Sequence, residues 1–266
     1  MYRLLAVDLD GTLLDDNNEL SRGTVKAITA AREAGVYILP VSGRPYRSIA
    51  PVMDELRFSD NYAVAMAGSD IRKYPDGKSL HSVCLTARDM LKIYEFSLKL
   101  GITLQIFRVD GSYFFSEDND YTAAYARYFG YEGKVADLTA LPFDDVCKCM
   151  LLLEEERMGE VISSARSLLS PELRVEPTWA TIIDLYAAGG DKATALRYVA
   201  KKLGIPMCEV AAVGDEIVDI PMLDAAGLGI AMGNANEELK ARGYAVVSDN
   251  AHDGVARAIY DLILKS

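Results

Sequence analysis

The run Leu4–Val7 constrains the fold more than any other stretch, because it places four apolar residues in a row without a turn signal. Such a run predicts a buried strand. A helix is expected next over residues 21–34, then an apolar strand over 36–41 and a second helix over 46–56. Strands and helices that alternate in this way indicate a parallel sheet with right-handed crossovers.

The alternation is absent from residues 82–188, which show instead the pattern of helices mixed with strand hairpins. We therefore expect an inserted α+β domain over residues 82–188, within a core domain formed by residues 1–81 and 189–266. The single tryptophan, Trp179, is expected to be buried in the inserted domain.

Beyond the insertion, the strand and helix alternation resumes. The helices expected there cover residues 192–203, 218–225, 232–242 and 253–264. The strands expected there cover residues 210–213, 228–231 and 245–247. This segment would therefore complete the parallel sheet that the first 81 residues begin.

Composition excludes several classes of function. The chain has 266 residues and a net charge of −11, without a block rich in lysine or arginine, so nucleic acids and anionic membranes would repel it. No apolar run reaches membrane-spanning length. We expect no signal peptide, because Met1 leads directly into the first strand. The four cysteines lack metal-type spacing, and Cys147 and Cys149 alternate in an apolar run, so they are expected to be packing residues in a reducing cytoplasm. The protein is expected to be a monomer or a homodimer.

Two carboxylates follow the first apolar run. On a strand, side chains two residues apart point to the same side, so Asp8 and Asp10 are expected to face one point. Neighbouring carboxylates repel each other unless a cation lies between them or one of them carries a proton. Mg²⁺ is the first candidate, because it prefers oxygen ligands in a compact shell. Alone, the pair fits equally well a strand that ends in an Asp-Gly turn.

Three further segments are predicted at the same edge of the sheet, where open parallel sheets bind ligands. Ser42-Gly43 follows a strand and offers a hydroxyl and backbone N–H groups to an anion, although a plain helix cap also fits. Lys192 lies at a helix start, where the helix dipole disfavours a cation unless an anion is bound; a surface lysine is the alternative. Asp215 would complete the metal shell. Asp219 would support it, or would simply be an acid favoured at a helix start.

Taken in order, these segments are similar to the haloacid dehalogenase superfamily, and within it to the Cof-like phosphatases with a large α/β cap. The matching segments are Asp8-Leu9-Asp10-Gly11-Thr12-Leu13-Leu14, Val41-Ser42-Gly43-Arg44-Pro45, Asp191-Lys192-Ala193, Gly214-Asp215, Asp219-Ile220-Pro221-Met222-Leu223, Met232-Gly233-Asn234-Ala235 and Asp253-Gly254-Val255-Ala256. The resemblance implies an α/β fold with a doubly wound, Rossmann-like parallel sheet core and an inserted α+β cap domain.

The resemblance also implies a mechanism. Asp8 would be the nucleophile that forms an aspartyl-phosphate, and Asp10 would protonate the leaving oxygen and then activate water. Mg²⁺ would be held by Asp8, the backbone carbonyl of Asp10 and Asp215. Ser42 and Lys192 would hold the phosphoryl group. The expected function is Mg²⁺-dependent hydrolysis of a small phosphorylated metabolite, such as a sugar phosphate.

Two positions depart from the subfamily, which usually has asparagine where this chain has Val218 and Ala67. We expect an active enzyme that is slow or unusually selective, because amide hydrogen bonds are lost but no ligand or nucleophile is. The alternatives are a sugar phosphomutase and a catalytically weak protein that binds a phosphorylated ligand. Arg44 lies beside the predicted phosphate pocket, where it would contact the substrate or pair with a surface acid.

Overall fold

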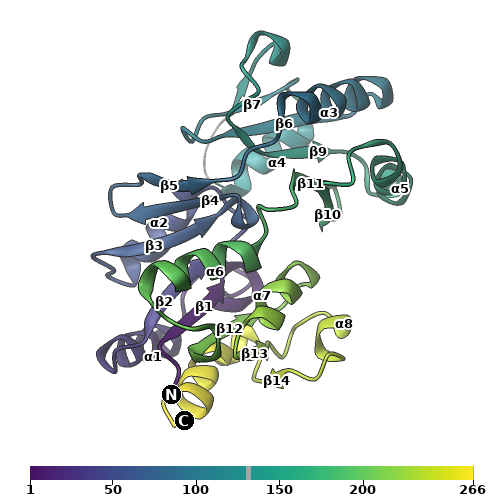
Figure 1. Ribbon diagram of the computed structural model, residues 1–266. Helices are drawn as coiled ribbons and strands as arrows, with labels where there is room; N and C mark the ends of the chain where they lie inside the picture. Colours follow the sequence, from purple (N-terminus) through teal and green to yellow (C-terminus); the bar gives the residue numbers. More distant parts are fainter. Residues whose placement is uncertain (130–132, 266) are drawn as a thin grey trace. The chain divides into compact units, whose positions relative to one another are not determined.

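A computed structural model describes residues 1–129 and 133–265 (Figure 1). Internal packing divides the chain into two compact units, Met1–Leu80 with Asp191–Ser266, and His81–Gly190. Each unit has its own β-sheet. Among the described residues, no helix is both long enough and apolar enough to cross a lipid bilayer.

The first unit is built on an eight-stranded sheet of order β14-β13-β12-β1-β2-β3-β4-β5. The strands are β1 (Leu4–Asp8), β2 (Tyr37–Val41), β3 (Asn61–Ala65), β4 (Asp70–Tyr74), β5 (Ser79–Ser82), β12 (Val210–Gly214), β13 (Leu228–Ala231) and β14 (Ala245–Val246). The pairs from β14 to β3 are parallel, and β4 runs antiparallel to β3. The predicted parallel sheet core is therefore confirmed.

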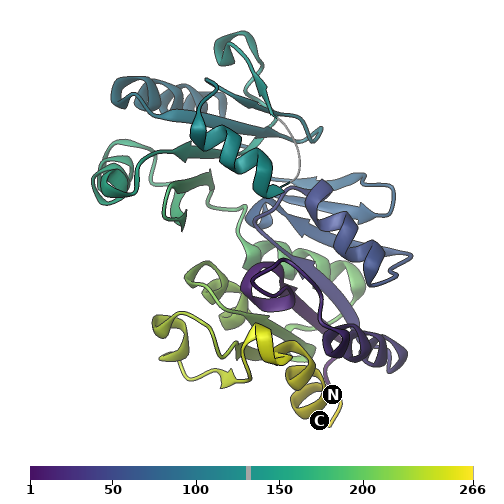
Figure 2. The ribbon, with the colours of Figure 1, turned by 180° about the vertical axis from the view of Figure 1, so that it is seen from behind.

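Helices cover both faces of this sheet. They are α1 (Arg22–Glu33), α2 (Tyr46–Glu55), α6 (Lys192–Leu203), α7 (Ile220–Ala225), α8 (Glu237–Lys240) and α9 (Gly254–Arg257), with a π-helical turn at Ala258–Ile263. Helices α6 and α7 pack together on the face seen in Figure 1. Helices α1 and α9 pack together on the opposite face, which Figure 2 shows. This is the doubly wound arrangement.

The register of the sheet aligns the carboxyl ends of three strands. Asp8, the last residue of β1, lies level with Val41 at the end of β2. On the other side of β1, Val7 lies level with Val213 of β12. The residues that follow β2 and β12 therefore lie on either side of Asp8. This is the switch point at which ligands bind in doubly wound sheets.

The second unit contains a six-stranded sheet of order β10-β11-β9-β6-β7-β8. Its strands are β6 (Thr103–Arg108), β7 (Tyr113–Phe115), β8 (Lys134–Val135), β9 (Val146–Leu152), β10 (Leu173–Trp179) and β11 (Ile182–Ala187). Its helices are α3 (Ala87–Leu100), α4 (Asp120–Phe129) and α5 (Met158–Leu168). One face of the sheet forms a hydrophobic core with α3 and α5, to which Met90, Ile93 and Val161 contribute.

Two expectations about local structure are wrong. Trp179 is 38% exposed rather than buried, because it ends β10, which is the edge strand of its sheet. The helix expected over 232–242 is reduced to α8. Asn236 caps α8 by accepting the N–H of Glu238, and its own N–H donates to the carbonyl of Asp215. That contact keeps the preceding residues as a loop beside the carboxyl end of β12.

Candidate active site

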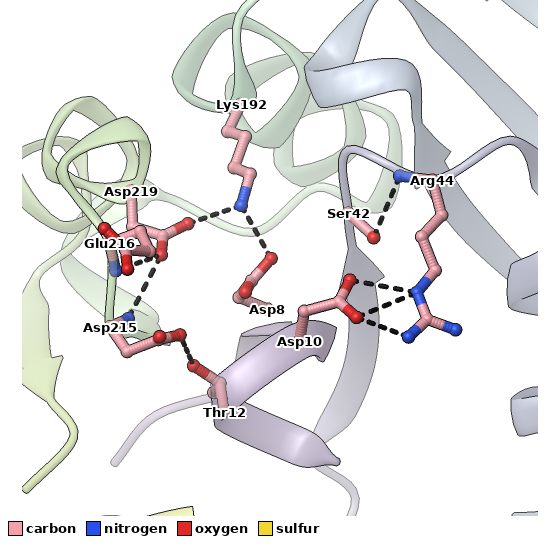
Figure 3. Close-up of polar contacts among 9 residues, drawn as sticks. All are labelled: Asp8, Asp10, Thr12, Ser42, Arg44, Lys192, Asp215, Glu216 and Asp219. Atoms are coloured by element: carbon pink, nitrogen blue, oxygen red, sulfur yellow. Dashed lines mark hydrogen bonds and ion pairs between the residues drawn. The ribbon is translucent and has the colours of Figure 1, made fainter. Parts of the chain in front are cut away.

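Three buried carboxylates and one ammonium group meet beyond the ends of β1 and β12 (Figure 3). Asp8, Asp215 and Asp219 each offer a carboxylate oxygen, and these oxygens lie within 4.8 Å of one another. Lys192 begins α6, and its Nζ donates to Asp8 Oδ1 over 2.6 Å and to Asp219 Oδ1 over 2.5 Å. Lys192 is itself buried, so its alternative assignment as a surface lysine is wrong.

The charges in this cluster do not balance, because three carboxylates face one ammonium group. Burial, and then the charge of Asp219, raises the pKa of Asp8 well above its usual value, although Lys192 opposes the shift. Burial and Asp219 also raise the pKa of Asp215 to about 7. Burial alone would lower the pKa of Lys192, but Asp219 and Asp8 more than reverse this effect. An all-oxygen donor set in which three carboxyl groups face one ammonium group fits a hard divalent cation such as Mg²⁺.

Hydrogen bonds separate the roles of the three carboxylates. In Asp219, Oδ1 accepts from Lys192, and Oδ2 accepts the backbone N–H groups of Asp215 and Glu216, each over 3.1 Å. Both oxygens of Asp219 are thus engaged within the protein. Asp8 and Asp215 are the carboxylates best suited to hold a metal ion, and Asp219 orients the lysine and the end of β12 beside them.

Asp10 does not lie on β1, so the expectation that it shares one side of the strand with Asp8 is wrong. The strand ends at Asp8, and the chain then turns at Asp10 and Gly11, whose backbone angles are not helical; Gly11 has a φ of 71°. The Asp10 carboxylate instead accepts two hydrogen bonds from Nε of Arg44, of 2.9 and 3.1 Å, and another from its Nη2. The Asp10 side chain is 40% exposed, so it is the accessible carboxylate of the group.

The loop after β2 is fixed by β3 and by the loop that follows β3. The N–H of Ser42 donates to the carbonyl of Val64 over 2.9 Å, and its Oγ accepts the N–H of Arg44 over 3.1 Å. The N–H of Ala67 donates to the Ser42 carbonyl over 3.0 Å. Ala67 has a φ of 60°, which asparagine and glycine adopt more easily than alanine. The asparagine usual at this position in Cof-like phosphatases therefore also suits the backbone.

Sequence reasoning missed two polar side chains of the site. The Thr12 hydroxyl donates to Asp215 Oδ1 over 2.5 Å, and the Asn234 amide donates to the Gly11 carbonyl over 2.8 Å. Both residues lie in segments that carry the family resemblance. Their partners, however, are 203 and 223 residues away in the chain, and no local pattern indicates such contacts.

Gly11 leaves no room for a side chain. A Cβ at this position would lie 2.4 Å from Asp215 Oδ2, and the backbone has a positive φ. Gly11→Ala is therefore expected to displace Asp215 and to lower both Mg²⁺ affinity and turnover, by roughly 100-fold for a displacement of about 1 Å. Calorimetric Mg²⁺ titration and a phosphate-release assay measure the two effects.

Gly35→Ala is the matched control for this change. Gly35 also has a positive φ, of 86°, but no atom lies within 4 Å of its added Cβ. The control should therefore lower only the free energy of unfolding, by about 1–2 kcal/mol, and leave activity unchanged. Normal Mg²⁺ binding by Gly11→Ala would contradict the proposed crowding at Asp215.

A parallel sheet with buried carboxylates, a paired lysine and a hydroxyl-bearing loop at its switch point defines the class of metal-assisted phosphoryl-transfer enzymes. The chain belongs to the haloacid dehalogenase-like hydrolases, because the model of that family matches residues 5–259. The family predicted from the sequence is therefore confirmed.

Relatives and solved structures agree with this assignment. YxeH of Bacillus subtilis strain 168, provisionally named a phosphatase, is 30% identical over 272 residues and covers 99% of both chains. The pyridoxal phosphate phosphatase YbhA of Escherichia coli K12 is 29% identical over 282 residues, covering 98% of this chain and 99% of its own. A haloacid dehalogenase-like hydrolase from Bacteroides thetaiotaomicron superposes with a TM-score of 0.86 at 26% identity, covering 97% of this chain and 98% of its own. The predicted fold class and enzyme class, a phosphatase, are confirmed; the substrate and Mg²⁺ stay predictions.

Proposed function

We propose that the chain is a Mg²⁺-dependent phosphatase of small phosphorylated metabolites, sugar phosphates among them, with residues 82–188 as its cap domain. One observation carries the proposal: Lys192 joins Asp8 to Asp219 in a buried cluster in which three carboxyl groups face one ammonium group. A purely structural ion pair would have matched charges, because unpaired buried carboxylates are costly. A site that receives a divalent ion and a phosphoryl group accounts for the excess of carboxyl groups.

In this proposal Asp8 is the nucleophile. One of its carboxylate oxygens forms a bond to phosphorus, and the ester oxygen leaves with a proton from Asp10. Asp10 then takes a proton from water, whose oxygen bonds to phosphorus and releases inorganic phosphate and the Asp8 carboxylate. Two easier displacements replace one difficult one. A bound Mg²⁺, held by Asp8, Asp215 and the backbone carbonyl of Asp10, would neutralise charge on the phosphoryl oxygens.

Lys192 and the loop Ser42-Gly43 are proposed to hold the phosphoryl group. The ammonium group of Lys192 stays charged at physiological pH, because Asp219 and Asp8 hold its pKa above the usual value. It supplies local positive charge in a chain whose net charge is −11. Backbone N–H groups after β2 add further donors for an anion.

A panel of phosphate monoesters, assayed with Mg²⁺ and with a chelator, tests the proposal. We expect release of inorganic phosphate with Mg²⁺ only. A phosphomutase would instead require a sugar bisphosphate and return a phosphorylated sugar. A ligand-binding protein would bind esters tightly without turnover. Failure to hydrolyse any ester with any divalent metal would contradict the proposed function.

Arg44 is proposed to orient Asp10 rather than to contact the substrate. Its guanidinium group donates hydrogen bonds to the Asp10 carboxylate and also to Asn18 Oδ1, the latter over 2.5 Å. Arg44→Lys keeps the positive charge but loses the bidentate contact with the Asp10 carboxylate. We expect kcat/KM for alkyl phosphates, whose leaving oxygen needs a proton, to fall roughly 10- to 100-fold.

The leaving group separates this role from phosphate binding. For p-nitrophenyl phosphate, whose leaving group departs without a proton, kcat/KM of Arg44→Lys should change by less than about threefold. Steady-state kinetics with both esters measure the difference. An equal loss for both esters would indicate that Arg44 binds the phosphoryl group instead.

A further inference from the structure

The loop after β13, residues 232–236, carries part of the family resemblance but contributes no side chain to the acid cluster. Its backbone is bound to the segment that follows β12. The N–H of Met232 donates to the carbonyl of Gly214 over 3.1 Å, and the N–H of Asn236 donates to the carbonyl of Asp215 over 2.8 Å. One side of this loop is therefore attached to the segment that carries the proposed metal ligand Asp215.

Two asparagine side chains attach the same loop to the turn after β1. The Asn234 amide donates from Nδ2 to the carbonyl of Gly11 over 2.8 Å, and its Oδ1 accepts the N–H of Asn250 over 3.1 Å. The Asn250 amide in turn donates to the carbonyl of Leu14 and to Asp16 Oδ1, each over 3.1 Å. The two asparagines are thus connected to each other, and they hold carbonyl groups at residues 11 and 14 of one turn.

Close backbone packing brings the two asparagines together. The N–H of Gly233 donates to the carbonyl of Ser248 over 3.1 Å, and a Cβ at Gly233 would lie 2.7 Å from the backbone nitrogen of Asp249. No side chain fits at such a distance. The absence of a side chain at residue 233 therefore allows residues 248–250 to lie against the loop after β13, where the N–H of Asn250 reaches Asn234.

The turn after β1 needs support from outside because Gly11 lies within it. Glycine adopts many backbone conformations, so its own preferences do not fix the direction of the neighbouring groups. On one side of Gly11 is Asp10, whose backbone carbonyl is a proposed Mg²⁺ ligand. On the other side is Thr12, whose hydroxyl donates to Asp215 Oδ1 over 2.5 Å. A rotation of the backbone at Gly11 would move both groups, and the hydrogen bond from Asn234 opposes that rotation.

A neutral amide suits this position beside the acid cluster. A lysine or arginine could also donate to the Gly11 carbonyl, but its charge would attract the carboxylates of Asp8 and Asp215 and compete with a metal ion for them. A carboxylate could not donate to a carbonyl group at all. The asparagine amide supplies a donor and an acceptor without either effect.

We propose that Asn234 and Asn250 are positioning residues for the Mg²⁺ site. They hold the turn after β1 so that the backbone carbonyl of Asp10 is directed to the ion that Asp8 and Asp215 bind. The inference rests on the proposed function, since it concerns the metal ion of that function. Neither asparagine bonds to phosphorus or transfers a proton in the proposed mechanism, so their loss should weaken Mg²⁺ binding first.

Asn234→Ala tests the inference most directly. Calorimetric titration at pH 8 should show a Mg²⁺ affinity about 10- to 100-fold below that of wild type, the usual loss when a group that orients a metal ligand is removed. The Mg²⁺ concentration for half-maximal phosphate release should rise by the same factor. With Mg²⁺ saturating each protein, KM for the ester should stay within about twofold. The melting temperature in chelator should change little, because Asn234 is exposed.

Asn61→Ala is the matched control in the same unit. The Asn61 amide also donates to a backbone carbonyl, that of Ile38, over 2.8 Å. Asn61 is the first residue of β3, however, so it lies at the amino edge of the parallel strands, away from Asp8. Because Asn61 is buried, its replacement should lower the melting temperature by more than Asn234→Ala does, and it should leave Mg²⁺ affinity unchanged.

Asn250→Ala tests the second member of the pair. This variant keeps the backbone N–H that donates to Asn234 but loses the contact with the carbonyl of Leu14. Its Mg²⁺ affinity should therefore fall by less than that of Asn234→Ala, about three- to tenfold. Thermal unfolding in chelator and calorimetric titration of the full-length variants give these values.

The outcomes separate the inference from the proposed function. Unchanged Mg²⁺ affinity in Asn234→Ala or Asn250→Ala, beside normal binding by the wild type, would overturn the inference and leave the proposed function intact. An equal loss of affinity in Asn61→Ala would also overturn it, because a general loss of stability would then be the cause. A wild-type protein that binds no divalent ion and hydrolyses no ester would instead overturn the proposed function itself.

Discussion

Replacing Asp8 with asparagine is expected to abolish phosphate release from every ester and to make the metal-free protein more stable. Activity should fall roughly 10⁴- to 10⁶-fold, the range observed when an enzyme loses its nucleophile or an essential partner of it. Stability should rise because one of three crowded carboxylates becomes neutral, while the amide oxygen still accepts from Lys192. A phosphate-release assay and calorimetry in the presence of a chelator at pH 8 measure the two effects.

Asp70→Asn is the control for this prediction. Asp70 is another buried aspartate of the first unit, but its carboxylate is paired with Arg72 and accepts from Ser79 over 2.8 Å. Its neutralisation should lower stability and leave activity intact. Wild-type turnover by Asp8→Asn would disprove the assignment of the nucleophile. A loss of stability in Asp8→Asn like that of Asp70→Asn would disprove the electrostatic crowding.

Mg²⁺ affinity is expected to rise at least tenfold per pH unit up to about pH 7, because the pKa values of both proposed carboxylate ligands, Asp8 and Asp215, are raised. Burial and Asp219 raise the pKa of Asp215 to about 7, so below that pH a proton must leave before the ion binds. A chelator should remove all turnover, and added Mg²⁺ should restore it. Calorimetric titration from pH 5.5 to 8.5 measures the slope. Asp215→Asn should bind Mg²⁺ far more weakly and with a shallower slope; a pH-independent affinity in the wild type would contradict this prediction.

The same shift in pKa determines how the stability of the metal-free protein changes with pH. The usual pKa of an aspartate is 3.8, so the folded chain retains a proton on Asp215 between about pH 4 and 7 that the unfolded chain releases. The stability from this group is present below pH 3.8 and is lost as pH rises through 7. The melting temperature in chelator should therefore fall between pH 5 and 8. With saturating Mg²⁺ that fall should disappear, because the ion replaces the proton.

The fold was predictable where one local pattern determines one element. The apolar run Leu4–Val7 is β1 almost to the residue, since a buried strand in a parallel sheet needs apolar side chains throughout. A helix was expected over 232–242, and its shortening to α8 was not predictable. The contact of the Asn236 N–H with the carbonyl of Asp215 competes with helix formation, and it depends on the folded sheet. Trp179 is exposed because it lies on an edge strand. The residues around Trp179 in the sequence do not indicate which position its strand takes in the sheet.

The sequence indicated which residues form the candidate site better than it indicated how their side chains are arranged. The order of the motifs indicated Asp8, Lys192 and Asp215 as neighbours, and the structure brings them together with Asp219. The direction of Asp10 was not predictable, because the strand ends two residues earlier than the side-chain alternation assumed. Contacts such as that of Thr12 with Asp215 form only in the completed sheet, so the spacing of residues along the sequence does not indicate them.

The position of β1 has a consequence for the chain during its synthesis. β1 lies between β2 and β12, yet β12 begins at Val210, about 200 residues after β1 ends. At translation rates of about 5–20 residues per second, one edge of an apolar strand stays unpaired for roughly 10–40 s. An open edge of this kind can pair with other chains. The nascent chain is therefore open to such pairing until about its last fifth emerges from the ribosome.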